Sequence, residues 1–417
     1  MKNLKVFGIF AIMTVFCLAY SADQAKTGDA DLMARARALH RNMLTVDTHS
    51  DTSGSLLDKE WNIAERHQPG QRGSTKVDLP RMKEGGLDAE FFSVFVGQDE
   101  LTPEGYEKAR ERALVTLDAV HKMCEDHADL IGLALTPDDA IKLKKQGKLA
   151  AFIGMENGYP VGRNLAYLEE YYKKGIRYLT LCHGGNNDIC SSSSRRDGGE
   201  DYGLTDFGKQ VVAACNRLGI MVDVSHISDK SFFDVLAAAR APIIASHSGC
   251  RALAGSSRNL TDDQLRALAK NGGVIQVVFL GSYLRDFKPN PARDEAIKEL
   301  QKKFGPRREI KDEAVLAKYR QEMEEVNKKY PQERATVKDV VDHIDHVVKT
   351  IGIDYVGIGT DFDGGGGVVG CDDASEMINV TVELMRRGYS DKDITKIWSG
   401  NLFRVFNKVI EIANASS

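Results

Sequence analysis

The segment Val-Asp-Thr-His-Ser-Asp-Thr, residues 46–52, places a histidine and an aspartate two residues apart. Side chains two residues apart on an extended strand point to the same side, so His49 and Asp51 can converge on one ion. Such a pair alone is weak evidence for metal binding, because the spacing also arises by chance or in strand-end capping. A metal site therefore requires further ligands from other parts of the chain.

Further candidates occur where other apolar, strand-like segments end. They lie in short motifs: Glu156 in G-M-E-N-G, His183 in L-C-H-G-G, His226 in D-V-S-H, His247 in A-S-H-S and Asp361 in G-T-D-F-D-G. Chance explains this pattern poorly, since several strand ends would have to carry His, Asp or Glu for unrelated reasons. Nitrogen and carboxylate ligands without thiolate suit zinc, with manganese or cobalt as substitutes.

The number of candidate ligands favours two ions. His49, Asp51, Glu156, His226 and His247 are more than one tetrahedral site with an open position needs. Two zinc ions per chain that share a carboxylate would use all five. Glu156 is the expected bridge, because it lies in the sequence between the first pair and the later histidines. A hydroxide held between two such cations could attack a carbonyl without a serine or cysteine nucleophile.

Other candidates suit proton transfer and charge stabilisation. Asp361, beside open backbone at glycines 364–367, is expected to take a proton from the attacking water and pass it to a leaving nitrogen. His183 is not needed as a metal ligand once the five others are counted, and it is expected to stabilise the oxyanion of the tetrahedral intermediate. Asp363 would point to the opposite face of a continuing strand, so a structural role is expected. The other six histidines, His343 among them, are expected at the surface.

The elements that must position these side chains are typical of a closed parallel barrel. Eight apolar, β-prone segments recur at residues 44–47, 91–96, 150–155, 177–182, 220–224, 242–245, 274–280 and 355–359. Helix-length amphipathic stretches separate most of them. This alternation favours an α/β fold of the (β/α)8 TIM-barrel type, in which catalytic side chains lie where the strands end. A doubly wound open sheet is the alternative.

One barrel domain accounts for most of the 417 residues. Two lysines precede an apolar run at residues 6–19, which is too short for a comfortable membrane span, and small residues follow it. This pattern predicts a signal peptide at residues 1–21 and a single domain at 22–417. A segment rich in Lys, Glu and Arg, residues 285–338, predicts a charged helical insertion between the seventh and eighth strands.

Composition narrows the partners and the compartment. A formal net charge of -4 and the lack of a basic stripe argue against nucleic acid and favour a small-molecule substrate. No second apolar stretch of spanning length follows the signal, so we expect a soluble protein that is exported to the periplasm or secreted. Six of the seven cysteines lie after the signal, but their scattered spacing assigns no disulfide and forms no zinc-thiolate motif.

These motifs resemble those of the zinc dipeptidases typified by renal membrane dipeptidase. The matching blocks, in the family's order, are D-T-H-S-D-T at 47–52, G-M-E-N-G at 154–158, L-T-L-C-H at 179–183, G-L-T-D-F-G at 203–208, D-V-S-H at 223–226, A-S-H-S at 245–248, S-R-N-L-T-D-D at 257–263 and G-I-G-T-D-F-D-G at 357–364. They run through most of the chain after the signal, so the match is specific.

The resemblance implies an amidohydrolase-type barrel with two zinc ions that hydrolyses dipeptides with a free carboxylate. It implies these metal ligands: His49, Asp51, Glu156, His226 and His247. It also implies substrate contacts from His183, Arg258 and Asp361. Arg258 follows from the resemblance alone, and its guanidinium fork suits a dipeptide carboxylate. The family accepts a D-residue at the C-terminal position and is commonly homodimeric, although this sequence neither supports nor excludes a homodimer.

Two other functions stay open. One is a cyclic-amide, lactone or phosphotriester hydrolase on the same barrel. Many such relatives bridge their metals with a modified lysine from the fourth strand, whereas R-Y-L-T-L-C-H at 177–183 contains no lysine. The other is a periplasmic protein that binds metal or peptide without catalysis, which would leave Asp361 without a task.

Overall fold

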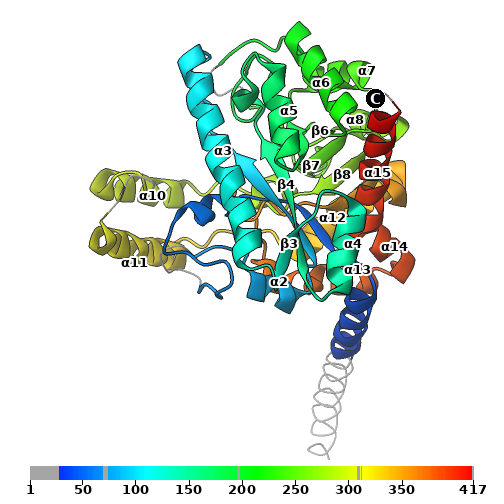
Figure 1. Ribbon diagram of the computed structural model, residues 1–417. Coiled ribbons are helices and arrows are strands. Elements are labelled where there is room, and N and C mark those ends of the chain that lie inside the picture. Colours follow the sequence, from blue (N-terminus) through cyan, green and yellow to red (C-terminus); the bar gives the residue numbers. More distant parts are fainter. Residues whose placement is uncertain (1–27, 69–73, 195–197, 308–309, 311, 416–417) are drawn as a thin grey trace, which may run out of the picture.

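A parallel barrel surrounded by helices forms the centre of the molecule (Figure 1). The computed structural model describes residues 28–68, 74–194, 198–307, 310 and 312–415, so the predicted signal peptide lies outside the described residues. Eight strands follow one another as neighbours around the barrel: β1 (Val46–Ser50), β2 (Ala89–Phe95), β4 (Leu149–Glu156), β5 (Ile176–Thr180), β6 (Met221–Asp223), β7 (Ile244–Ser248), β8 (Val274–Val277) and β9 (Val356–Ile358). The predicted (β/α)8 fold is confirmed.

The first and last strands close the barrel just beyond the end of β9. The backbone N–H of Asp51 donates to the carbonyl of Phe362 at 2.8 Å, and the N–H of Asp361 donates to the carbonyl of His49 at 3.0 Å. The buried carboxylate of Asp47 on β1 accepts the N–H of Thr360 at 2.8 Å. Residues from the two ends of the sequence therefore meet where the site residues were predicted.

Aromatic side chains fill the barrel interior at the end where the strands begin. Phe91 of β2 stacks on Phe152 of β4 and on Tyr178 of β5, with ring centroids 4.6 and 5.4 Å apart. Phe403 and Phe406 of the last helix contact Phe152 edge-on. This end of the barrel is therefore packed with apolar side chains, which leaves the opposite end for polar chemistry.

The helices around the barrel are α2 (Leu79–Gly85), α3 (Pro103–Asp126), α4 (Pro137–Lys145), α5 (Leu165–Lys173), α6 (Asp206–Leu218), α7 (Asp229–Ala238), α8 (Asp262–Asn271), α9 (Gly281–Leu284), α12 (Val337–Ile351), α13 (Ile378–Arg386), α14 (Asp391–Thr395) and α15 (Asn401–Asn414). A further helix covers residues 28–42. Helices α4, α8 and α12 each begin with a capping box headed by a threonine. The threonine side chain accepts a hydrogen bond from a backbone N–H of the first turn and so stabilises the start of the helix.

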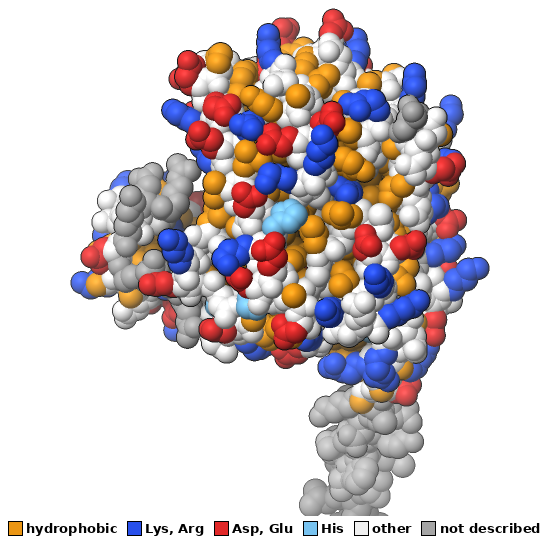
Figure 2. All heavy atoms as spheres, in the orientation of Figure 1, with side chains coloured by type: hydrophobic (Ala, Val, Ile, Leu, Met, Phe, Trp, Pro, Cys, Tyr) orange, Lys and Arg blue, Asp and Glu red, His pale blue; other side chains and the backbone are white. Residues whose placement is uncertain are grey.

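The predicted charged insertion is helical. Helices α10 (Pro291–Phe304) and α11 (Glu313–Lys329) lie side by side and project from the barrel (Figure 1). The Phe304 and Tyr319 rings hold them together at 5.9 Å, and Lys303 pairs with Glu322 at 2.5 Å. On the face shown in Figure 2, acidic and basic side chains are interspersed over the barrel.

Several details differ from the sequence-based expectation. A short strand, β3 (Ile131–Leu133), pairs with β4 outside the ring of eight and was not predicted. The expectation of surface positions for the remaining histidines was wrong for His40 and His343, which are buried and hydrogen-bonded. The six cysteines of the described residues are buried and free of disulfides.

Candidate metal centre

The side chains predicted from strand ends gather at the end of the barrel where the strands finish. His49 and His247 lie within β1 and β7, Glu156 is the last residue of β4, and Asp51 follows β1. Three others each lie three residues beyond a strand: His183 after β5, His226 after β6 and Asp361 after β9. Parallel strands bring all seven to one face of the barrel although they span most of the sequence.

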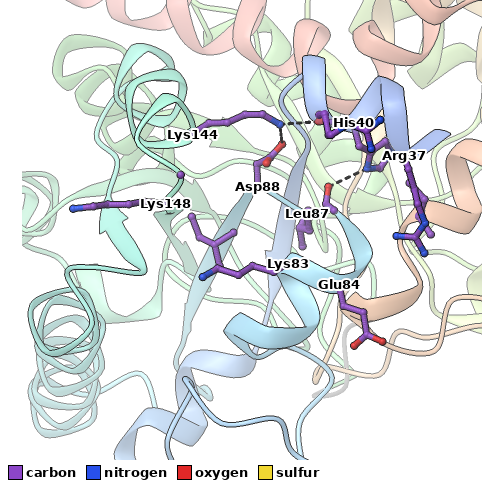
Figure 3. A pocket seen from close by; sticks show the side chains of 13 residues that line it. Arg37, His40, Lys83, Glu84, Leu87, Asp88, Lys144 and Lys148 are labelled. Carbon is purple, nitrogen blue, oxygen red and sulfur yellow. Dashed lines mark hydrogen bonds and ion pairs between the residues drawn. The ribbon is translucent and has the colours of Figure 1, made fainter. Parts of the chain in front are cut away.

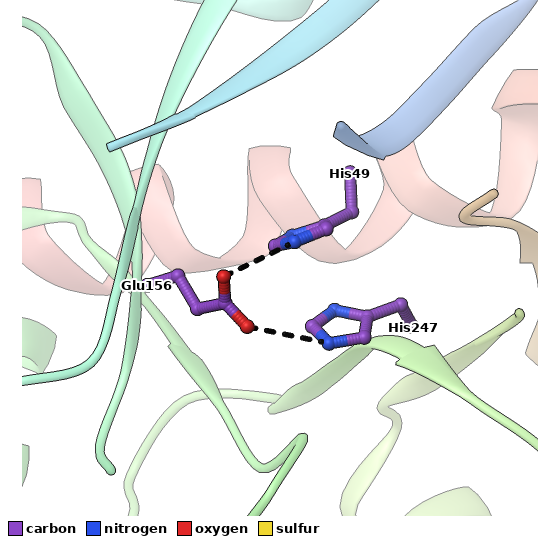
Figure 4. A group of neighbouring side chains, drawn as sticks. All are labelled: His49, Glu156 and His247. Carbon is purple, nitrogen blue, oxygen red and sulfur yellow. Dashed lines mark ion pairs between the residues drawn. The ribbon is translucent and has the colours of Figure 1, made fainter. Parts of the chain in front are cut away.

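Glu156 lies at the centre of this cluster and turns its two oxygens to different partners. Its Oε2 is 3.4 Å from Nε2 of His49, while its Oε1 is 2.9 Å from Nε2 of His226. The same Oε1 is 3.6 Å from Nε2 of His247 (Figure 4) and 3.7 Å from Nε2 of His183. One carboxylate thus faces the β1 side and the histidine side of the cluster at once.

The donor atoms are close enough to share ions. Nε2 of His226 and Nε2 of His247 lie 2.8 Å apart, and Asp51 Oδ1 lies 3.9 Å from Nε2 of His49. Three groups keep their donor atoms within 4.8 Å: His49 with Glu156 and His247, Glu156 with His183 and His226, and His49 with Asp51 and Asp361. Their imidazole and carboxylate donors are the set that zinc prefers without thiolate.

Unsatisfied polar atoms provide a second sign that the cluster fits metal ions. Nε2 of His49 and Oδ1 of Asp51 are buried without a hydrogen-bond partner. An unpaired buried donor or acceptor is costly, and in native proteins it needs an explanation. Divalent cations between these atoms would provide the missing partners, so the residues present fit a metal centre.

Neighbouring side chains aim two of the imidazoles into the cluster. Nδ1 of His247 is 2.9 Å from the hydroxyl of Ser246, which itself donates to the carboxylate of Asp223 at 2.6 Å. Since the Ser246 hydroxyl proton is already donated to Asp223, Nδ1 of His247 must carry a proton and donate it to Ser246. The lone pair of Nε2 then faces Glu156. Nδ1 of His49 similarly contacts the hydroxyl of Tyr178 at 2.7 Å. Sequence reasoning missed these supports, although Asp223 and Ser246 lie within the recognised motifs.

The buried cluster is crowded with acidic groups. Burial raises the pKa of Asp51 well above its usual value, and the nearby Glu156 carboxylate adds to this effect. Burial also raises the pKa of Asp361 to about 7. Burial favours the neutral ring of His49, but the Glu156 carboxylate prevails and raises its pKa to about 10. In the metal-free protein, protons balance this charge, and divalent cations can replace them.

Arg258 lies in the loop between β7 and α8 with its guanidinium beside the cluster. It is only 5% exposed, and its Nη2 donates to the carbonyl of His247 at 3.1 Å. Nε and Nη1 are buried without a partner. Burial lowers the pKa of His226 well below its usual value, and the charge of the nearby Arg258 lowers it further. Free guanidinium donors beside the cluster suit a substrate carboxylate.

The backbone around the site adopts rare conformations. His226 and Asp361 have φ angles of 71° and 61°, in the left-handed region that L-residues seldom occupy. The glycine run beside Asp361 is closely packed, contrary to the expected open backbone. A Cβ at Gly364 would lie 2.2 Å from Asp361 Oδ1 and 2.3 Å from Asp51 Oδ2. Asp363 accepts hydrogen bonds from Thr52 and from the backbone of Lys76, so it supports the loop.

His183 borders the cluster on the side of the β2 end. Its ring centroid is 4.2 Å from that of His226 and 4.8 Å from that of Phe95, the last residue of β2. A cavity of about 430 Å³ adjoins Phe95 and Asp51. No motif predicted this cavity, because its walls come from β2, α3 and the turn after β1.

A second cavity, of about 530 Å³, lies at the opposite end of the barrel, where the helix 28–42 meets the first residues of β4 (Figure 3). Figure 2 shows Lys and Arg side chains gathered at this lower end of the molecule. Lys144 pairs there with Asp88 at 2.5 Å. The cavity is remote from the clustered histidines, so it is not part of the candidate metal centre.

Comparison with known proteins identifies the family of the chain. The family model of membrane dipeptidase, peptidase family M19, matches residues 33–417. Dipeptidase tcpJ of Claviceps purpurea is 30% identical over 359 residues, which cover 85% of this chain and 74% of that protein.

Two solved structures resemble the whole barrel. The probable dipeptidase PvdM from Pseudomonas aeruginosa is 32% identical with a TM-score of 0.76, covering 92% of this chain and 100% of that one. A metallo peptidase from Rhodobacter sphaeroides, solved with a phosphinate mimic of the dipeptide L-Ala-D-Ala, is 25% identical with a TM-score of 0.69, covering 88% and 99%. The chain thus shares its fold with metal-dependent peptidases.

Proposed function

The chain belongs to the membrane dipeptidase family, peptidase family M19, and is a metal-dependent dipeptidase, and we propose that it works with two zinc ions on free dipeptides. The observation that carries the proposal is the position of Glu156, whose two oxygens face His49 on one side and His226 on the other. A carboxylate placed in this way suits a bridge between two ions.

The proposed ligands divide around that bridge. His49 and Asp51 would hold one ion, His226 and His247 the other, and Glu156 would contribute to both. Ions bound there supply Lewis acidity, which lowers the pKa of water and polarises a carbonyl group. The hydrogen-bond partners of the Nδ1 atoms, Ser246 at His247 and Tyr178 at His49, keep the two rings oriented. Little reorganisation is therefore needed when ions bind.

Three side chains are proposed to handle the substrate. Arg258 binds the dipeptide carboxylate through its two unpartnered N–H groups. Asp361 takes the proton from the attacking water and passes it to the leaving nitrogen, since its carboxylate lies within the cluster beside His49 and Asp51. His183 donates a hydrogen bond to the developing oxyanion from the partly open side of the cluster.

We further propose tolerance of a D-residue at the C-terminal position and an exported protein. The first is supported by the Rhodobacter sphaeroides relative, which was solved with a mimic of L-Ala-D-Ala. The second rests on the signal-like residues 1–21 of the sequence. Among the described residues, no helix has both the length and the apolar character to cross a bilayer.

Metal removal tests the proposal. The full chain after any signal processing is assayed on Ala-L-Ala and Ala-D-Ala before chelation, after chelation and after zinc is restored. We expect hydrolysis of both dipeptides to be lost with the metal and to return with about two zinc ions per chain, counted by elemental analysis. Activity that ignores the chelator would contradict the proposal. Efficient turnover of lactones or cyclic amides without dipeptide hydrolysis would favour the other hydrolase class.

A further inference from the structure

The cavity of about 430 Å³ beside the metal centre has a largely apolar wall. Leu57, Phe95 and Val115 line it and expose 48%, 41% and 56% of their surface. They are three of the eleven large hydrophobic side chains that are exposed among the described residues. Exposed apolar side chains gathered around one hollow indicate a binding site rather than ordinary surface.

This cavity opens beside the reacting groups. Asp51 lines it and also faces His49 in the metal centre. Phe95, on its other side, contacts the ring of His183 at 4.8 Å. A group bound in the cavity would therefore extend from a substrate whose reacting carbonyl lies at the cluster.

The order of the strands sets the direction of the bound dipeptide. The cavity adjoins the ends of β1 and β2, whereas Arg258 follows β7, which is four places from β2 in the ring of eight. Strands four places apart in an eight-stranded barrel lie on opposite sides. With the carboxylate of a dipeptide at Arg258 and its peptide bond at Glu156, the N-terminal residue points toward the cavity.

We propose that this cavity binds the side chain of the N-terminal residue and selects dipeptides that begin with a bulky apolar residue, such as leucine or phenylalanine. The inference rests on the proposed dipeptidase function and adds the substrate class. Glu111 and Arg112 line the same cavity with opposite charges. The charges of these two side chains oppose each other, so the pair favours neither an acidic nor a basic substrate side chain strongly.

Dipeptides that share a C-terminal alanine test the preference. The zinc-loaded enzyme is assayed on Leu-Ala, Phe-Ala and Gly-Ala. We expect kcat/KM for Leu-Ala and Phe-Ala to exceed that for Gly-Ala by about tenfold or more, as apolar pockets commonly discriminate. Phosphinate mimics of Leu-Ala and Gly-Ala, titrated by calorimetry, should bind in the same order without turnover.

Variants assign the preference to this cavity. Val115→Glu places a charge on the exposed face of α3 and should lower the ratio of Leu-Ala to Gly-Ala kcat/KM by about tenfold. Ile141→Glu on α4 is the matched control, because Ile141 is also a β-branched, exposed helical residue but does not line the cavity. The control should keep the wild-type ratio.

A second variant guards against misfolding of the first. A Cβ at Gly54 would meet no heavy atom within 4 Å, and Gly54 lines the cavity. Gly54→Leu should therefore fit without strain and lower the same ratio by occupying the space. Circular dichroism shows whether Val115→Glu is folded. If it is not, the kcat/KM ratio of Gly54→Leu tests the preference in its place.

The outcomes separate this inference from the proposed function. Failure to hydrolyse any dipeptide would contradict the function. Hydrolysis of Gly-Ala as fast as Leu-Ala, or a ratio unchanged in both cavity variants, would overturn the inference alone. Loss of Ala-Leu rather than Leu-Ala activity in the variants would overturn it too, because the cavity would then bind the C-terminal residue.

Discussion

Glu156 controls the charge balance of the site at the scale of single residues. Burial alone would raise its pKa, but His49 and then His226 lower it below the usual value. The same ion pair raises the pKa of His49 to about 10. A proton on His49 therefore occupies the position that a cation would take, and metal binding should release protons.

Asp361 is predicted to move a proton without holding the metal. Asp361→Asn should keep about two metal ions per chain but lower kcat about a hundredfold or more, because the amide cannot accept the proton from water. Elemental analysis and steady-state kinetics measure the two effects separately. Asp363→Asn, two residues along the same loop and outside the proposed machinery, is the matched control. Unchanged turnover in Asp361→Asn would rule out the proton-transfer role.

Arg258 is predicted to recognise the free carboxylate of the substrate. Arg258→Ala should lower kcat/KM for a free dipeptide about tenfold to a hundredfold, since one charged hydrogen-bonding partner is lost. The effect should be much smaller for the same dipeptide with an amidated C-terminus. Arg251→Ala is the control, because Arg251 lies in the same loop but pairs with Asp229 at 2.6 Å. Equal losses on both substrates would contradict the assignment.

The sequence predicted which residues gather at the site better than it predicted what supports them. The motifs alone identified all seven side chains that the structure brings together in the cluster, and the resemblance to the dipeptidases added Arg258. Tyr178, which contacts His49, and Asp223, which accepts from the Ser246 hydroxyl beside His247, lie on other strands, so no local spacing reveals them. His40 and His343 were misjudged for the same reason, because their partners lie far along the chain.

At the scale of elements, one buried histidine ties the helix 28–42 to the barrel. Nδ1 of His40 must donate to the carbonyl of Gly86, at 3.0 Å (Figure 3). Its Nε2 then accepts from the hydroxyl of Thr381 at 2.7 Å, and Trp398 donates to that same hydroxyl. This chain of hydrogen bonds requires a neutral ring, and burial lowers the pKa of His40 from 6.5 to about 4.

This pKa predicts a loss of stability in mild acid. As the pH falls below 6.5, unfolded chains protonate His40 first, and the folded protein follows only near pH 4. The stability due to the neutral ring is therefore complete above pH 6.5 and is lost progressively down to about pH 4. The total is about 3 kcal/mol. As the pH falls over this range, the free energy of unfolding measured in urea should decrease more steeply for the wild type than for His40→Gln.

The control for His40→Gln is the same substitution at another histidine. His121→Gln alters a partly exposed histidine on α3, whose ring contacts the carbonyl of Lys174. Other titrating groups act equally in all three proteins, so only the difference between the curves is informative. Parallel curves for the wild type and His40→Gln would contradict the prediction.

The elements themselves were largely predictable because the barrel strands are apolar on both faces and the inserted helices are rich in helix formers. Their limits were less so. β1 extends to Ser50 and not to Asp47, so His49 belongs to the strand itself. β3 has only three residues, Ile-Gly-Leu, which are too few for a periodic signal.

At the scale of the whole molecule, the metal centre joins strands from both halves of the chain. Removing the metal should lower the melting temperature by several degrees, because ions that bind only the folded state stabilise it by mass action. It would also leave buried carboxylates close together. Scanning calorimetry with and without chelator measures the shift, and zinc should reverse it. Glu156→Gln should respond much less to the chelator, and a melting temperature independent of bound metal would contradict the prediction.

Closure of the barrel by its first and last strands also bears on when the protein can acquire its ions. Asp47 and Thr360, which join across this seam, are 313 residues apart. A growing chain contains His49 and Asp51 long before Thr360 exists to close the barrel beside them. The proposed ligands therefore reach their final positions only once residue 360 has been made and the barrel has closed. The metal supply of the compartment where folding ends, and not that of the ribosome's surroundings, then decides which ion the enzyme carries.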